Sequence, residues 1–151
     1  MKLTLNREFA MRHVGVALLM LGLSCWFGYD GFVRYPATPA AELYKAIEGS
    51  DAPAGFNLEA FKTQKTQTQY GFTFLTFLAA VVIGGHVWLI SKFKFEYDDE
   101  SYVFAGKRVA IKDIKSVDRS LWERKSIIKV DGIKLDAWHH VGVKEFVEKL
   151  K

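Results

Sequence analysis

Four histidines and a nearby aspartate are the residues of this sequence whose types could bind a metal ion. Asp136 precedes the adjacent pair His139 and His140, and imidazole nitrogens and carboxylate oxygens are ligands that zinc accepts. Adjacent side chains point to opposite faces of a strand and diverge on a helix, so the pair does not converge on one ion. We therefore expect Asp136 or one of the histidines to cap the helix that follows, and we predict no metal site.

The other two histidines, His13 and His86, lie at the ends of apolar stretches. An ionisable residue inside a membrane span is a functional candidate by default, and two histidines at the same depth could ligate a haem iron. A neutral imidazole near the membrane–water interface costs little and needs no ligand, so we expect no cofactor. The sequence also lacks the motifs GxxxxGK[ST], GxGxxG, GxSxG and HExxH. It therefore predicts a non-enzymatic protein with no catalytic residue.

A third candidate site is a short basic and aromatic cluster, formed by Arg119, Trp122, Arg124 and Lys125. Such residues near the inner leaflet could contact anionic lipid headgroups or a protein partner. Two acidic neighbours reduce the net charge of the cluster, and a tryptophan in a β domain can equally be a core residue. We favour a core position for Trp122 and keep lipid or partner contact as the alternative.

The candidate residues lie in or next to two apolar stretches and a C-terminal third in which apolar and charged residues alternate. The chain has 151 residues, 50% hydrophobic and 25% charged, but the hydrophobic residues concentrate in 13–33 and 70–91. The stretch 70–91 carries no formal charge, and about 20 helical residues cross the hydrocarbon core of a bilayer. We predict a transmembrane helix in each stretch. For 13–33 a signal peptide is the alternative, but the aromatic residues that follow its apolar core do not suit a cleavage site.

Small residues spaced four apart occur in both predicted spans. They are Ser24 and Gly28 in the first span and Ala80 and Gly84 in the second. Such pairs allow close helix packing, either within a hairpin or between two copies in a homo-oligomer. Cys25 is the single cysteine, so the chain has no intrachain disulfide and no cysteine set for zinc.

Basic residues predict the orientation of the spans. Arg7, Arg12, Lys92 and Lys94 flank the spans at one end, whereas the connection between the spans has Arg34 alone near its first edge. The positive-inside rule then places 1–12 and 92–151 in the cytoplasm and 34–69 outside it. The net charge of +4 is not gathered into blocks, so we predict membrane lipids and a protein partner rather than nucleic acid.

The connection 34–69 predicts short helices. Thr38 followed by Pro39 suits a helix start, Gly49 suits its end, and Asn57 suits the cap of a helix that continues into the second span. This connection either lies on the outer leaflet or docks a partner.

Residues 92–151 predict a small α+β domain. Strand patterns cover 93–97, 101–105, 109–111, 126–130 and 133–138, with an irregular strand over 114–122. Asp131-Gly132 between two of them suits a type I′ hairpin turn. Val143, Phe146, Val147 and Leu150 form one face of a closing helix. The predicted fold class is a membrane α-helical hairpin plus a small antiparallel β meander or partial barrel with a C-terminal helix.

The region 93–151 resembles the bacterial pleckstrin-homology-like domains of membrane-anchored proteins. The resemblance rests on GKRV at 106–109, KDI at 112–114 and LW at 121–122, followed by a hairpin and a helix. It implies a PH-like domain without catalytic residues on the cytoplasmic face of a bacterial inner membrane, where it would mediate protein interaction or assembly. Tethering to the membrane would raise its effective concentration for partners there. The alternative is an accessory subunit of a membrane transporter or respiratory complex.

Overall fold

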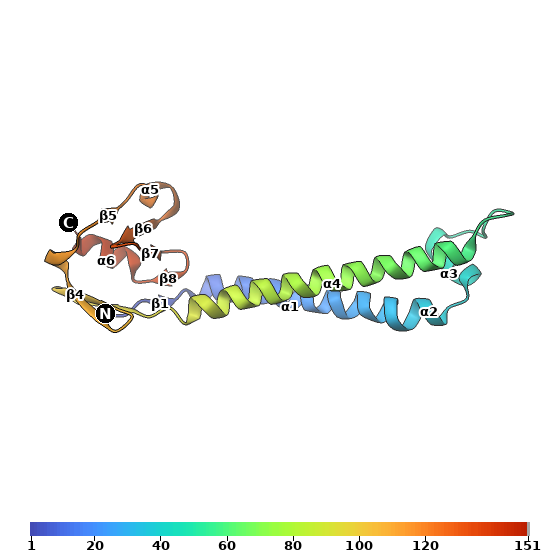
Figure 1. The fold of residues 1–151 in the computed structure, drawn as a ribbon, viewed down its shortest axis with the longest axis horizontal. Coiled ribbons are helices and arrows are strands. Elements are labelled where there is room, and N and C mark those ends of the chain that lie inside the picture. The colour runs from blue at the N-terminus through green and yellow to red at the C-terminus, as the bar shows by residue number, and fades with distance from the viewer. Residues whose placement is uncertain (151) are drawn as a thin grey trace. The chain divides into compact units, whose positions relative to one another are not determined.

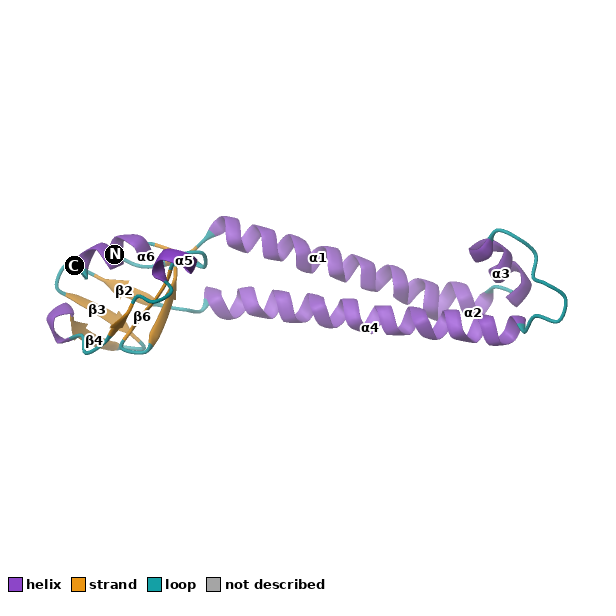
Figure 2. Cartoon of the chain, turned by 90° about the horizontal axis from the view of Figure 1, so that it is seen from above, coloured by secondary structure: helices purple, strands orange, loops and turns teal. Residues whose placement is uncertain are grey.

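Two compact units make up the chain in the computed structural model, which describes residues 1–150. The β unit consists of Met1–His13 and Gly85–Lys151, and the helical unit consists of Val14–Gly84. All the strands labelled in Figures 1 and 2 belong to the β unit.

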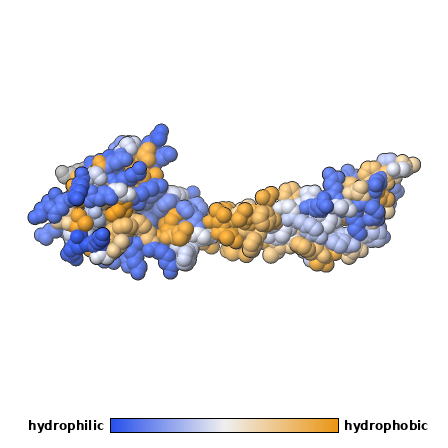
Figure 3. Space-filling view, in the orientation of Figure 1, coloured by the Kyte–Doolittle hydropathy of each residue, from blue (hydrophilic) through white to orange (hydrophobic). Residues whose placement is uncertain are grey.

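Two long helices have the length and composition to cross a membrane. The first runs through α1 (Arg7–Tyr29), a π-helical segment (Asp30–Arg34) and α2 (Tyr35–Ala37), and the second is α4 (Leu58–Ser91). They have 31 and 34 residues, and only 17% and 11% of their most apolar windows are buried inside the protein. Figure 3 shows the resulting band of exposed hydrophobic surface over α1 and α4.

The start of α4 confirms the cap predicted at Asn57. The Asn57 Oδ1 atom accepts a hydrogen bond from the Ala60 amide at 2.9 Å, which satisfies a donor that the first turn leaves free. From there α4 runs without a break through the polar stretch into the apolar one.

The short helix α3 (Ala40–Glu48) ends as predicted at Gly49, which has a φ of 74°. Its start differs from the prediction, because the N-cap position is Pro39 rather than Thr38. The Thr38 hydroxyl instead donates a hydrogen bond to the Arg34 carbonyl at 2.7 Å. It therefore gives a hydrogen-bond partner to a carbonyl near the end of the preceding helix.

Inside the helical unit, α1 and α4 run antiparallel and in contact (Figure 2). The Ser24 hydroxyl donates to the Thr73 carbonyl at 3.0 Å. Further along, the Phe32 and Tyr70 rings lie 4.6 Å apart between centroids. The helices also pack tightly at Gly31, where an added Cβ would lie 3.0 Å from Gln69 Cβ and 3.0 Å from a Tyr70 ring carbon.

Gly31→Leu is therefore expected to push the two helices apart and to cost about 1–3 kcal/mol of stability. Gly22→Leu is the matched control, since a Cβ at Gly22 meets nothing within 4 Å. Thermal unfolding of the purified full-length protein compares the two variants. Equal stability of both would show that the helices are not packed at Gly31.

The strands of the β unit form two three-stranded antiparallel sheets and one short pair. The first sheet contains β2 (Phe95–Tyr97), β3 (Ser101–Phe104) and β4 (Lys107–Ala110). The second contains β5 (Val117–Asp118), β6 (Ile127–Val130) and β7 (Ile133–Asp136), with the short helix α5 (Trp122–Lys125) between β5 and β6. A 3₁₀ turn (Ile111–Asp113) connects the sheets, and α6 (Val143–Lys149) closes the chain. Small antiparallel sheets with a C-terminal helix confirm the α+β prediction. The strand expected over 114–122 is reduced to β5, because the chain turns into α5.

The predicted hairpin turn is present between β6 and β7. Asp131 and Gly132 both have positive φ, at 47° and 81°, and Val130 pairs directly with Ile133, as a type I′ turn requires. Asp131 also joins the two sheets, because its carboxylate accepts hydrogen bonds from the Ser116 amide at 3.0 Å and the Tyr102 hydroxyl at 3.0 Å. Burial opposes ionisation of this carboxylate, but the hydrogen bonds prevail and hold the pKa of Asp131 below its usual value.

The N-terminal segment is part of the β unit, which the sequence did not predict. Strand β1 (Thr4–Leu5) pairs antiparallel with β8 (His140–Val141). On the other side, the Leu3 amide donates to the Phe95 carbonyl at 2.9 Å, and Lys2 bridges to Glu96. The segment thus lies between β2 and β8.

Leu3 belongs to the hydrophobic core of the β unit. Its side chain is 2% exposed, while Phe95 and Phe146 are fully buried in the same cluster. An added Cβ at Gly142 would lie 3.0 Å from Leu3 Cδ2, and Gly142 has a φ of 98°. Glycine at this position therefore lets the N-terminal segment pack directly against the residue that precedes α6.

Candidate functional site

Three histidines, His13, His86 and His139, lie around the buried ring of Phe9. His140 lies next to His139 and against Phe93, and we call the four residues the histidine cluster. Phe9 is 1% exposed. Its ring centroid lies 4.1 Å from that of His13, 4.7 Å from that of His139 and 6.3 Å from that of His86. The cluster is built from the first turns of α1, the last turns of α4 and the turn between β7 and β8.

Asn6 positions Phe9 within this cluster. Its Oδ1 atom accepts hydrogen bonds from the Glu8 amide at 3.0 Å and the Phe9 amide at 3.5 Å, so Asn6 caps α1. Its Nδ2 atom donates to the Trp138 carbonyl at 3.0 Å. One side chain thus connects the start of α1 to the turn that carries His139.

Asp136 positions the turn between β7 and β8 rather than the closing helix, which corrects the sequence prediction. Its Oδ1 atom accepts a hydrogen bond from the Trp138 amide at 2.9 Å, and its Oδ2 atom lies 3.6 Å from His139 Nδ1. Helix α6 starts instead after Gly142, without a side-chain cap. The prediction was wrong because an aspartate two residues before an amide satisfies that amide locally.

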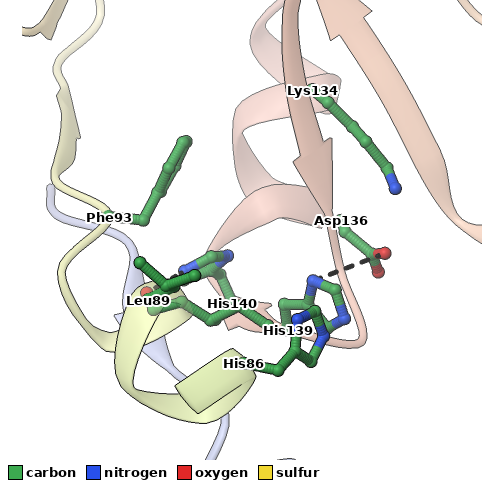
Figure 4. A pocket seen from close by; sticks show the side chains of 8 residues that line it. His86, Leu89, Phe93, Lys134, Asp136, His139 and His140 are labelled. Carbon is green, nitrogen blue, oxygen red and sulfur yellow. Dashed lines mark hydrogen bonds and ion pairs between the residues drawn. The ribbon is translucent and has the colours of Figure 1, made fainter. Parts of the chain in front are cut away.

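An open pocket of ≈ 280 Å³ lies beside the cluster. Figure 4 shows its lining side chains, which include His86, Leu89, Phe93, Lys134, Asp136, His139 and His140. His139 lies against His86, with ring centroids 5.7 Å apart and nearly perpendicular planes, whereas His140 points towards Leu89 and Phe93. The adjacent histidines therefore diverge, as predicted from their spacing.

The arrangement does not assemble a metal-ligand set. Within residues 1–150, no group of three His, Cys, Asp or Glu side chains has suitable geometry. The imidazoles of His86 and His139, which are nearly perpendicular, form an aromatic packing cluster with the buried phenyl ring of Phe9.

Burial lowers the pKa of both histidines in the turn. For His139 the nearby Asp136 carboxylate opposes this effect, while His86, His140 and Lys134 add to it. For His140, a hydrogen bond at 3.4 Å to the Ile90 carbonyl and the charge of Asp136 oppose the burial. Both rings are therefore neutral in the folded protein near pH 7.

A lowered pKa in the folded state makes stability depend on pH. An unfolded histidine binds its proton near pH 6.5, above the pKa of the folded ring, so stability is complete above about pH 6.5 and falls as the pH drops from there through the folded pKa. We expect the free energy of unfolding of the β unit, measured by urea pulse proteolysis, to decrease between about pH 7 and pH 5.

The double variant His139→Gln/His140→Gln is expected to remove most of this pH dependence. Asp98, Asp118 and Asp131 have lowered pKa values, so their contribution is lost only at still lower pH. If the wild-type protein were equally stable at about pH 7 and pH 5, the pKa values of His139 and His140 would not be lowered by folding.

The basic and aromatic cluster predicted at 119–125 lies on and before α5. Arg119 Nη2 donates to the Leu150 carbonyl at 3.1 Å. Trp122 is partly buried and packs against the core, whereas Arg124 and Lys125 are exposed. The four residues therefore do not share one free surface.

Of the small residues predicted to allow close helix packing, those in α1 lie against α4, whereas Gly84 in α4 has open space beside it. Ser24 and Gly28 both contact Thr73, and an added Cβ on Gly28 would lie 3.6 Å from Thr73 Cγ2. Ala80 is 9% exposed. At Gly84 an added Cβ would meet nothing within 4 Å.

Sequence reasoning missed Phe9 and Trp138, which the structure brings together with ring centroids 6.5 Å apart. One local signal for Phe9 was present: Asn6 is a typical N-cap residue, and the aromatic Phe9 lies three residues later, in the first turn of the helix that Asn6 begins. Nothing local to Trp138 indicates its neighbour from the other end of the chain.

No protein-family model, no curated protein and no solved structure matches this chain.

Proposed function

We propose that this chain is a non-enzymatic, multi-pass protein of a bacterial inner membrane. Its two long helices would form a transmembrane hairpin with both termini in the cytoplasm. Its β domain, a PH-like module, would mediate protein interaction or assembly at the membrane surface.

The exposed apolar surface of the long helices supports the membrane location. Side chains such as Leu18, Phe74 and Val82 are more than 60% exposed, and only 17% and 11% of the two apolar windows are buried. A core helix of a water-soluble protein would be mostly buried. Hydrocarbon is the solvent that suits such surfaces.

The position of Leu3 carries the proposal of a hairpin. Leu3 precedes the first helix, yet it packs in one core with Phe95 and Phe146, which follow the second helix. Segments that fold together must lie on the same side of the membrane, which supports two crossings rather than one. Cleavage of the first helix as a signal peptide would also remove Leu3 and Phe9 from the β unit.

Two three-stranded antiparallel sheets followed by a C-terminal helix are compatible with a PH-like module. Strand β4 is an edge of the first sheet, whose order is β2-β3-β4, and its Lys107 and Arg108 side chains are exposed. An edge strand offers backbone groups to a partner strand. We propose this edge as the docking element.

Affinity purification of the full-length protein in mild detergent, followed by identification of the co-purified protein, tests this function. Lys107→Glu/Arg108→Glu is expected to lose that partner, and Leu75→Ala, an exposed change on α4, is expected to retain it. Loss with Leu75→Ala and retention with the β4 variant would favour an accessory subunit whose helices carry the specificity.

A further inference from the structure

Two tryptophans of the β unit lie beneath basic side chains at the ends of the long helices. The Arg12 guanidinium carbon lies 5.7 Å from the centre of the Trp138 ring, and Lys92 Nζ lies 5.5 Å from the centre of the Trp88 ring. The rings are 43% and 59% exposed. Both pairs therefore combine a cation with an accessible aromatic face.

Trp138 belongs to the β domain but is held beside the start of α1. The Trp138 amide donates to Asp136, and the Trp138 carbonyl accepts from Asn6, which caps α1. This turn therefore presents the indole next to Arg12, which lies in the second turn of α1. Trp88 and Lys92 occupy the corresponding place at the end of α4.

The residues at the two helix ends carry a net positive charge. The basic side chains at the two helix ends are Arg7, Arg12, Lys92 and Lys94. Within residues 1–150 only Arg12 among them pairs with a carboxylate, that of Glu8. The other three are unpaired there, and the Arg12 side chain remains 64% exposed in its pair, so all four cations are accessible to an anionic ligand.

We infer that these residues bind the phosphates of anionic lipid headgroups, with Trp138 anchoring the β domain at headgroup level. The inference rests on the proposed membrane location. Tryptophan favours the membrane–water interface, where its ring is apolar and its N–H is solvated. Arginine and lysine at this level attract anionic lipid. The surface differs from the cluster at 119–125 that the sequence singled out.

Native mass spectrometry of the full-length protein in neutral detergent measures the apparent Kd for phosphatidylglycerol, with phosphatidylcholine for comparison. We expect preference for phosphatidylglycerol. Arg12→Gln and Lys92→Gln should each weaken its binding about fivefold, since each basic residue near an anionic surface contributes about 1 kcal/mol. Trp138→Ala should weaken binding of both lipids.

Arg124→Gln/Lys125→Gln is the charge-matched control, because it removes two exposed cations from α5, and it should leave the Kd unchanged. Weakening by this control alone, or no effect of Arg12→Gln and Lys92→Gln, overturns the inference. Competition by inorganic phosphate at equal concentration also overturns it, because that result indicates a site for a free anion. If instead cell fractionation finds the protein outside the membrane, the proposed function itself fails.

Discussion

Leu3→Ala is expected to lower the free energy of unfolding of the β unit by about 2–5 kcal/mol, the range for a buried leucine truncated in a core. Leu3 is 2% exposed, and its Cδ2 atom packs directly against Gly142. The loss occurs although the substitution lies ninety or more residues from the strands that it destabilises. Urea pulse proteolysis of the full-length protein measures it.

Thr4→Ala is the control for Leu3→Ala, because Thr4 directly follows Leu3, begins strand β1 and is exposed. It should change stability by no more than about 0.5 kcal/mol. If both variants match the wild type while Leu135→Ala, in the same core, is destabilised, the N-terminal segment is not part of the β unit.

Phe9→Ala is expected to cost about 3–5 kcal/mol, since it empties the centre of the histidine cluster. The phenyl ring contacts His13, His86 and His139, so its loss leaves three imidazoles without an apolar surface between them. Water can then reach His139, which should raise its pKa towards the ordinary value. NMR titration of the imidazole protons measures this second effect.

Met11→Ala is the control for Phe9→Ala, because Met11 lies on the same helix and is 62% exposed. It should leave both stability and the histidine titration unchanged. A Phe9→Ala protein with wild-type stability and an unshifted His139 would mean that the start of α1 does not dock on the turn between β7 and β8.

Local signals in the sequence predicted those elements whose determinants lie within a few residues. The cap at Asn57, the positive φ of Asp131 and Gly132, and the apolar face of α6 each depend on neighbours close in the chain. Their geometry follows from the residue types alone.

The elements that the sequence did not predict depend on distant partners. Strand β1 has two residues, too few for an alternating pattern, and pairs with β8 more than 130 residues later. Phe9 and Trp138 likewise meet only because β1 lies beside β8. The prediction that Asp136 caps the closing helix was wrong because both a turn and a helix start have free amides. The turn is closer, and Asp136 accepts a hydrogen bond from the Trp138 amide in it.

The central claim is that both ends of a transmembrane hairpin fold together on the cytoplasmic side. Labelling of single cysteines in intact cells with a membrane-impermeant maleimide tests it most directly, with Cys25→Ser as the background because Cys25 is the only native thiol. Ser50→Cys lies in the connection between the helices, and Lys129→Cys lies on β6; both positions are exposed. We predict labelling of Ser50→Cys in intact cells and of Lys129→Cys only after lysis. Labelling of both in intact cells, or of Lys129→Cys alone, would contradict it.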